Sequence, residues 1–553
     1  MIESNDLFAR MWGLDEEQAM LRETVRDFVD ETVIPRREEL DRNAKYPHDL
    51  HDQLVEMGIL AMGLPEEAGG MDMGAVEQSV VYEELARGCT GLATGVGANS
   101  LGADPIILFG TPEQKVEYLT KVGEGAIAAY ALTEPNAGSD AGGIGTIAEL
   151  QLDGETYKLR GQKTYITNAG IASIYTIFAL TDPKRGARGV SCFIAEIDPE
   201  NPPAGIEFPA KFDKMGINAS ETREIIFDGF EVKKANIVGG KPGRGFLQAM
   251  GCFDVSRPMI GTMGVGLAQS AFDAALLYGH QRVQFGKPII HFSGLRQIFV
   301  DMWLQIAGAR AMVLGGARKV HRRFHDGIKG DVTAWSAMAK IMGSEAGRVS
   351  YDAMQATGGY GYMNETPFPK MMRDHKILEI FEGTNQIQRE QSGRQLIQTY
   401  QKHGSACPAE AEESLAKGES CGGNFAKQAW SILDRTMAQV LGDGQGEDAL
   451  GDRQEVHWIL GEMAMYAESS RFLSEGCAQA GQPAGHWVHD LGQAYARESL
   501  LRVVERSEFL LRGLHPKLHQ PLAGLLDEAR CAGNGLFAHR DALSKAILEH
   551  EAS

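Results

Sequence analysis

Two segments of the 553-residue chain combine residue types that can do chemistry. In the first, residues 131–143, Thr133 and Ser139 supply hydroxyl donors and Gly138 lets a ligand approach the backbone closely. In the second, Glu382 lies in a Glu-Gly-Thr turn, where a carboxylate can act as a general base. Each segment also fits a plainer role, because Ser/Thr/Gly turns often cap strands and most glutamates are solvated. The residue types alone leave both interpretations open.

The sequence around these segments favours the chemical interpretation. Residues 131–143 read ALTEPNAGSDAGG, and residues 355–361 read QATGGYG, followed by Lys370 and Asp374. Both stretches resemble motifs of the FAD-dependent acyl-CoA dehydrogenase family, and the resemblance covers roughly residues 10 to 400. It implies FAD as the cofactor. The hydroxyl and backbone donors of residues 131–143 fit this cofactor, because a flavin needs hydrogen bonds to its ring edge and backbone donors to its pyrophosphate.

The resemblance also implies which residues contact the cofactor. Residues 161–168, GQKTYITN, are similar to the segment that covers one face of the isoalloxazine, with Tyr165 where many relatives have Trp. Residues 282–287, RVQFGK, resemble the motif whose arginine reaches the FAD of a neighbouring subunit, while Ser293 replaces a family glutamine. This assignment implies at least a homodimer. The residues expected to bind FAD are Tyr130, Leu132, Thr133, Gly138, Ser139, Tyr165, Thr167, Arg282, Phe285, Gln355, Gly359, Thr384 and Gln386.

The catalytic base implied by the resemblance is Glu382. Residues 381–389, FEGTNQIQR, match the family's catalytic loop, in which the glutamate removes the α-proton of an acyl-CoA while the β-hydrogen passes as hydride to flavin N5. Some relatives carry the base on the helix that matches FDVSRP (253–258), but Val255 and Ser256 cannot serve there. The product is a trans-2-enoyl-CoA, and an electron-transfer flavoprotein is the expected electron acceptor. The residues expected to bind the substrate are Ser139, Asp254, Arg257 and Gly383.

Three alternatives use the same cofactor. An acyl-CoA oxidase would reduce oxygen, a monooxygenase would have no use for Glu382, and a non-catalytic flavin-binding scaffold would leave Glu382 and Arg257 idle. Asp254 and Arg257 also fit an ordinary ion pair within one helical turn. The acyl group stays open, although Leu92 in place of an arginine disfavours a dicarboxylic acyl chain.

The hydrophobic pattern predicts an α+β chain of several domains. Apolar residues recur at helical spacing before residue 127 and after 245, and short β-rich runs lie between, with Asp153-Gly154 as a hairpin signal. We expect an N-terminal helical domain (1–126), a middle β-sandwich or barrel (127–240) and a helical bundle of four helices (241–402). A linker (403–424) and a C-terminal helical extension (425–553) follow, placed like the extension of very-long-chain acyl-CoA dehydrogenases.

Composition excludes several classes of partner. The net charge of −20, with 22 Asp and Glu against 14 Lys and Arg after residue 400, disfavours nucleic acid. The seven cysteines form no CxxC pair, so no zinc site or disulfide framework is expected, and no other metal site is predicted.

The acidic N-terminus lacks a signal peptide, and we expect a cytoplasmic protein. Amphipathic stripes in the extension predict faces packed inside the protein rather than a membrane surface. We also expect the extension to cap the core and so to favour a dimer over the family's frequent tetramer.

Overall fold

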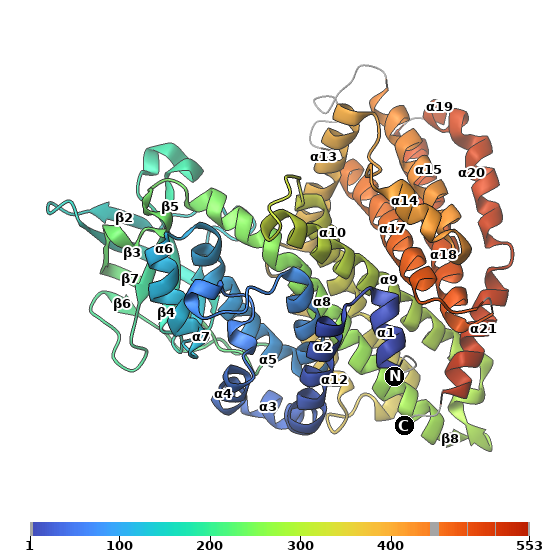
Figure 1. The fold of residues 1–553 in the computed structure, drawn as a ribbon, viewed down its shortest axis with the longest axis horizontal. Coiled ribbons are helices and arrows are strands. Elements are labelled where there is room, and N and C mark those ends of the chain that lie inside the picture. The colour runs from blue at the N-terminus through green and yellow to red at the C-terminus, as the bar shows by residue number, and fades with distance from the viewer. Residues whose placement is uncertain (1–3, 443–452, 484, 515, 551–553) are drawn as a thin grey trace. The chain divides into compact units, whose positions relative to one another are not determined.

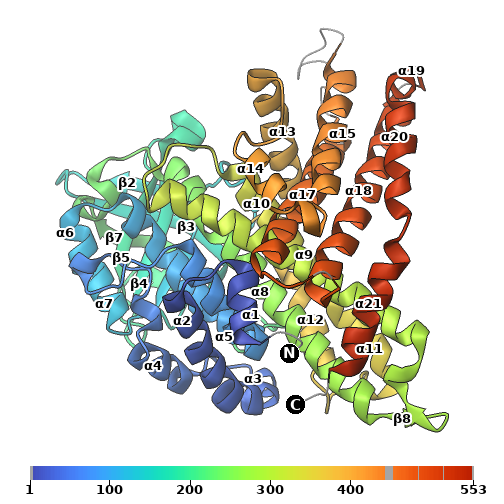
Figure 2. The same ribbon diagram turned by 45° about the vertical axis from the view of Figure 1, so that its right-hand side comes forward.

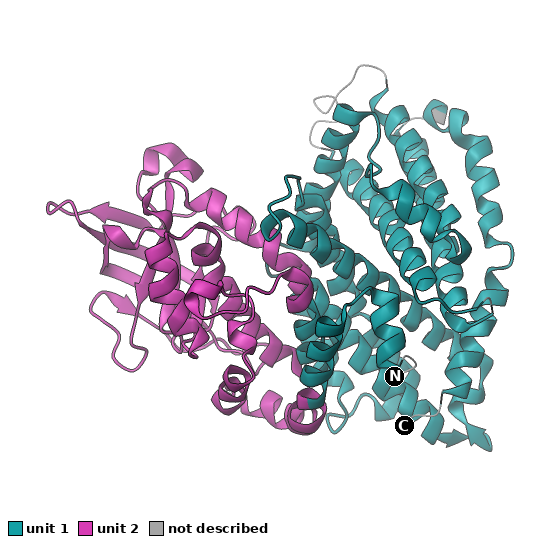
Figure 3. Cartoon of the chain, viewed as in Figure 1, with its two compact units in different colours: residues 1–27, 79–87, 260–553 teal, residues 28–78, 88–259 magenta. Residues whose placement is uncertain are grey.

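The computed structural model describes residues 4–442, 453–483, 485–514 and 516–550 (Figure 1). The chain forms two compact units (Figure 3). Unit 1 comprises residues 1–27, 79–87 and 260–553, and unit 2 comprises residues 28–78 and 88–259. Two long helices, α5 (Ala75–Phe109) and α8 (Gly245–Gln281), contribute residues to both units. The expected order of helices, then strands, then helices is confirmed.

Unit 2 is built on a seven-stranded sheet with the order β1-β4-β2-β3-β7-β6, in which β5 also pairs with β4. Its strands are β1 (Ala128–Ala131), β2 (Ile147–Leu150), β3 (Thr156–Thr167), β4 (Ile174–Leu180), β5 (Val190–Glu196), β6 (Ile206–Glu207) and β7 (Thr222–Lys233). The expected hairpin at Asp153-Gly154 joins antiparallel β2 and β3, with Gly154 at φ 71°. All seven β4 residues are buried, because Ile174 and Phe178 pack on one face of the sheet and Tyr175 and Ile177 on the other.

Short helices complete unit 2. They are α3 (Arg37–Asn43), α4 (His48–Glu56), α6 (Pro112–Gln114) and α7 (Thr120–Gly123). Ile106 of α5 and Val122 of α7 share a hydrophobic cluster with Ile174 and Phe178 of β4. This packing fixes one face of the sheet.

Unit 1 is helical apart from the hairpin of β8 (Val283–Gln284) and β9 (Lys287–Pro288) in its described residues. Besides its parts of α5 and α8, its helices before residue 404 are α1 (Asn5–Trp12), α2 (Glu16–Phe28, whose last residue falls in unit 2), α9 (Ser293–Phe324), α10 (Thr333–Ala346), α11 (Val349–Thr357), α12 (Phe368–Leu378) and α13 (Asn385–His403). Those of the extension are α14 (Ala411–Lys417), α15 (Gly423–Leu441), α17 (Gln454–Gln479), α18 (Trp487–Leu514), α19 (Pro516–His519), α20 (Ala523–Arg530) and α21 (Leu536–Glu549).

The extension shares its core with the bundle. Helix α17 packs on α9, α13 and α18, and α21 packs on α9 and α18 (Figures 1 and 2). Met312 of α9 and Leu396 of α13 belong to the same buried cluster as Trp430 of α15 and Leu460 of α17. The stretch 403–424 is not a bare linker either, since it contains α14, whose Ala411 and Leu415 are buried. The extension therefore stabilises the bundle directly, because it buries apolar side chains of both.

Helices α8 and α9 are long and apolar enough to cross a membrane. However, 78% of the most apolar window of α8 and 83% of that of α9 are buried inside the protein. Core packing accounts for the apolar composition of these two helices.

Candidate active site

In unit 2, the first motif is tied to strand β3 by a buried ion pair. Lys163, which is fully buried, donates from Nζ to Leu132 O at 3.0 Å and to Glu134 Oε1 at 2.6 Å. The next residue, Thr164, donates its amide to Thr133 O at 2.9 Å. These bonds bring the 131–143 segment against the 161–168 segment, as a common cofactor site requires.

The Glu134 carboxylate is the centre of this connection. It accepts hydrogen bonds from the amides of Gly145 at 2.6 Å and Thr146 at 3.0 Å. Burial raises the pKa of Glu134, but the charge of Lys163 and these donors together hold it below its usual value. Sequence reasoning missed both residues as supports of the loop, although each lies inside a quoted motif.

The surface of this loop offers donors and one aromatic face. Ser139 and Gly138 are exposed, Thr133 and Thr167 are half-buried, and a side chain added at Gly138 would meet no atom within 4 Å. Tyr165 has φ 57° and lies where the pairing of β3 with β7 is irregular, which leaves its ring 68% exposed. Hydroxyl and amide donors beside an exposed ring match the polar edge and flat face of a flavin.

The segment expected to line the substrate site contacts β1. The ring of Phe253 in α8 lies 5.8 Å from the ring of Tyr130. Arg257 is buried, with its guanidinium 5.7 Å from the Phe253 ring centre. Arg257 Nη1 lies 3.4 Å from Asp254 Oδ1, so the intrahelical ion pair considered as an alternative is present. A buried guanidinium beside the Phe253 ring is also suited to bind an anionic ligand.

In unit 1, Glu382 is held on a strained turn. Glu382 has φ 53° and Gly383 has φ 87°, a backbone region that costs a non-glycine residue free energy. Gln388, which is fully buried, donates from Nε2 to Glu382 O at 3.0 Å and to Gly383 O at 3.3 Å. Such strain persists only where surrounding contacts fix the conformation.

A buried lysine provides the second fixed point of this turn. Lys340 of α10 is fully buried and donates from Nζ to Gly383 O at 3.1 Å and to Asn385 Oδ1 at 2.8 Å. Ser344, one helical turn later, bonds to the same Asn385. Sequence reasoning missed Lys340, because nothing in the order of residues shows that α10 reaches the turn.

The neighbouring carboxylate Glu379 is unsuited to be a base. Its side chain binds Arg348 at 2.8 Å and Lys376 at 2.7 Å, and lies 3.4 Å from His375. Burial raises the pKa of Glu379, but His375, Lys376 and Arg348 together hold it far below its usual range. A carboxylate with so low a pKa accepts a proton poorly, which leaves Glu382 as the candidate base of this loop.

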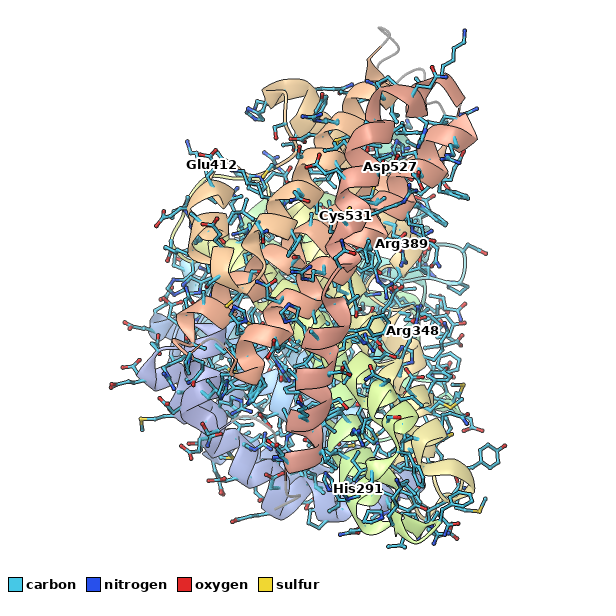
Figure 4. The ribbon with its side chains drawn as sticks, turned by 90° about the vertical axis from the view of Figure 1, so that its right-hand side faces the viewer. His291, Arg348, Arg389, Glu412, Asp527 and Cys531 are labelled. Carbon is cyan, nitrogen blue, oxygen red and sulfur yellow. The ribbon has the colours of Figure 1, made fainter. Side chains whose placement is uncertain are left out.

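The cations around Glu379 also orient the helix that follows the turn. Arg348 and Arg389 both pair with Glu345, at 3.2 Å and 2.8 Å, and lie one above the other in Figure 4. Arg389 belongs to α13, which begins directly after the turn. This network connects α10, the end of α12 and α13.

The remaining predicted cofactor residues of unit 1 fall in two groups. Thr384 caps α13, accepting the amide of Ile387 at 3.3 Å, and Gln386 is exposed beside it. A separate group, Arg282, Phe285, Gln355 and Gly359, is exposed, with Phe285 at 93%.

A ring contact connects the two segments of this exposed group. Tyr278, one turn before Arg282, stacks on Tyr360, next to Gly359, with ring centres 4.8 Å apart. This stacking holds the two segments next to each other on unit 1.

Models of one protein family match three consecutive stretches of the chain. The chain matches the family models of the acyl-CoA dehydrogenase N-terminal domain over residues 15–126, the middle domain over 129–230 and the C-terminal domain over 243–397. It is 38% identical to the acryloyl-CoA reductase (NADH) of Anaerotignum propionicum over 388 residues, which cover 70% of this chain and 96% of the relative.

Two solved structures extend the comparison. The butyryl-CoA dehydrogenase of Megasphaera elsdenii is 37% identical and superposes with a TM-score of 0.66, over 69% of this chain and 99% of that one. The acyl-CoA dehydrogenase of Bacillus anthracis complexed with FAD is 26% identical and superposes with a TM-score of 0.85. That match covers 97% of this chain and 95% of the other, so it includes the C-terminal extension.

Proposed function

Because the chain belongs to the acyl-CoA dehydrogenase family, we propose that it removes the α- and β-hydrogens of an acyl-CoA thioester with Glu382 as the base. The observation that carries this proposal is the turn at Glu382. Its backbone is held by Lys340 and Gln388, while the nearby Glu379 binds Arg348 and Lys376 and has a lowered pKa. A fixed carboxylate is required to take a weakly acidic proton beside a thioester.

The residues of unit 2 fit FAD, the cofactor of the family. Thr133, Ser139 and Thr167 would bind the polar edge of the flavin, and the exposed ring of Tyr165 would cover one face. When bound, FAD supplies an acceptor for the β-hydrogen. The backbone amide of Glu382 is the group that would polarise the thioester carbonyl as the α-proton leaves.

Substitution of the base tests the proposal. We expect Glu382→Gln to retain FAD and to bind acyl-CoA, seen as a shift of the flavin absorbance, but to lose turnover by at least about 10²-fold. Glu365→Gln, in an exposed loop of the same unit, is the matched control and should keep full turnover. Near-normal turnover of Glu382→Gln would reject Glu382 as the base.

We propose that the protein acts in fatty-acid β-oxidation in the cytoplasm. Its proposed electron acceptor is an electron-transfer flavoprotein. Rapid mixing of the acyl-CoA-reduced protein with air and, separately, with an electron-transfer flavoprotein distinguishes this from an oxidase. Fast reoxidation by the flavoprotein and slow reoxidation by air are expected. The acyl group is identified by testing a panel of acyl-CoAs and measuring the bleaching of the flavin by each. If the protein binds FAD but no acyl-CoA bleaches the flavin, it is a non-catalytic scaffold instead.

We further propose a homodimer. Phe285 is an exposed residue of the hairpin that follows α8, and Tyr278 near the end of α8 stacks on Tyr360. Tyr360 and Tyr362 are 55% and 73% exposed. Large apolar side chains at this exposure are suited to contact with a second copy, which would also place Arg282 on the partner's cofactor. The extension buries faces of α9 and α13, so these faces are covered from within the chain.

A further inference from the structure

A cluster of metal-binding side chains lies at the C-terminal end of helix α9. We propose that His321, His325 and Asp326 form a site for one divalent transition-metal ion of the Zn²⁺ class. The proposal does not rest on the dehydrogenase activity, because none of these residues belongs to the proposed active site. The sequence analysis did not predict it, although the His-x-x-x-His spacing was visible there.

The distances between the ligand atoms suit a four-coordinate ion. Asp326 Oδ1 lies 3.6 Å from His321 Nε2 and 3.5 Å from His325 Nδ1. One ligand atom from each of the three residues can be chosen so that all lie within 4.8 Å of one another. A tetrahedral ion with bonds of about 2.0–2.1 Å keeps its ligand atoms about 3.4 Å apart. The two distances from Asp326 are therefore already within about 0.2 Å of this spacing, and the two histidine nitrogens need to approach each other by at most about 1.4 Å.

The local fold explains why these groups converge. Residues four apart on a helix share one face, and the two imidazole rings lie with their centres 4.4 Å apart at 23°. The amides of His325 and Asp326 both donate to His321 O, at 2.8 Å and 3.2 Å, which turns Asp326 back toward the rings. The helix end adds a favourable term, because the negative end of the helix dipole attracts cations.

The donor set determines the kind of ion. Two imidazoles and one carboxylate favour Zn²⁺, Co²⁺, Ni²⁺ or Cu²⁺ over Mg²⁺ and Ca²⁺, which prefer oxygen ligands. The side chains of His321, His325 and Asp326 are 24%, 38% and 41% exposed, so water has access to the fourth position. Arg322 and Arg323 are exposed neighbours whose charge opposes a cation. Their repulsion weakens cation binding, and we expect an affinity in the micromolar range.

Metal titration of the full-length, FAD-loaded protein tests the site. After treatment with a chelator, we expect calorimetry to show one Zn²⁺ bound per chain at micromolar concentration, and Co²⁺ to give the intense visible absorption of a four-coordinate ion. His321→Gln and His325→Gln should each remove this one equivalent, and Asp326→Asn should weaken it. His291→Gln is the matched control, because His291 is exposed just before the opposite end of α9 (Figure 4) and should leave binding unchanged.

The comparison between variants separates this site from any other zinc-binding group. The wild type should hold one more equivalent of Zn²⁺ per chain than His325→Gln. Because His325 lies at the exposed end of α9, this substitution should preserve the circular dichroism and the melting temperature of the metal-free protein. Equal Zn²⁺ stoichiometry in the wild type and in the folded His325→Gln variant would overturn the proposal. So would a Co²⁺ spectrum that neither histidine substitution alters.

Discussion

Replacement of Lys340 by methionine tests the proposal that the candidate base is positioned from helix α10. Methionine keeps the length and the apolar stem of the side chain but removes the ammonium group. Gly383 O and Asn385 Oδ1 then each lose one of two donors, because Gln388 Nε2 still binds the first and Ser344 Oγ the second. A hydrogen bond from a charged group contributes about 1.5–3 kcal/mol, and removal of a buried charge recovers part of that loss. We expect a net loss of unfolding free energy of about 1–3 kcal/mol.

The effect on turnover follows from the geometry of the turn. Gln388 still binds Glu382 O in this variant, so the turn keeps one of its two fixed points. Displacement of a reacting group by about 1 Å lowers the rate by about 10²-fold, which corresponds to about 2.7 kcal/mol in the barrier. We expect kcat of Lys340→Met to fall by about that factor with little change in KM or in FAD content.

Steady-state kinetics, flavin absorbance and thermal melting together measure these expectations. Lys402→Met, at the exposed end of α13, is the control and should match the wild type. If Lys340 acts through Glu382, combining Lys340→Met with Glu382→Gln should lower turnover no further than Glu382→Gln alone. A folded, FAD-loaded Lys340→Met enzyme with wild-type kcat would refute the positioning role.

Three further expectations concern the turn, the flavin loop and the subunit contact. Gly383→Ala places a methyl group 2.5 Å from Gln388 Nε2 on a residue with φ 87°, so thermal or urea unfolding should show a loss of about 1–3 kcal/mol. Glu134→Gln leaves Lys163 buried without its partner, which should lower the unfolding free energy by about 3–5 kcal/mol at neutral pH. Because the pKa of Glu134 is lowered in the fold, its contribution to the unfolding free energy is present above the unfolded pKa of about 4.3 and is lost as the pH falls below that value. Below that pH, the unfolding free energy of the wild type should decline more steeply than that of Glu134→Gln. Parallel pH profiles of the two proteins would contradict the pairing. Sedimentation should show a dimer of the full chain that Phe285→Asp converts to monomer, and a stable tetramer would reject the capping role of the extension.

The motifs carried most of the functional prediction. Glu382 and the loop at Thr133 and Ser139 were predicted from runs of residues that are local in the sequence and resemble motifs of the family. The same is true of the hairpin at Asp153-Gly154, since turn residues act on their immediate neighbours. The extension was also predicted as helical, because amphipathic periodicity is a local property.

The tertiary structure decided which distant side chains support those motifs. Lys340 lies 42 positions before Glu382, and Lys163 lies 29 positions after Glu134, so no local pattern connects either pair. It also showed that 403–424 holds a packed helix and that the extension shares the core of the bundle. The physical reason is that turns and helical periods depend on near neighbours, whereas burial and long-range ion pairing depend on how complete elements pack.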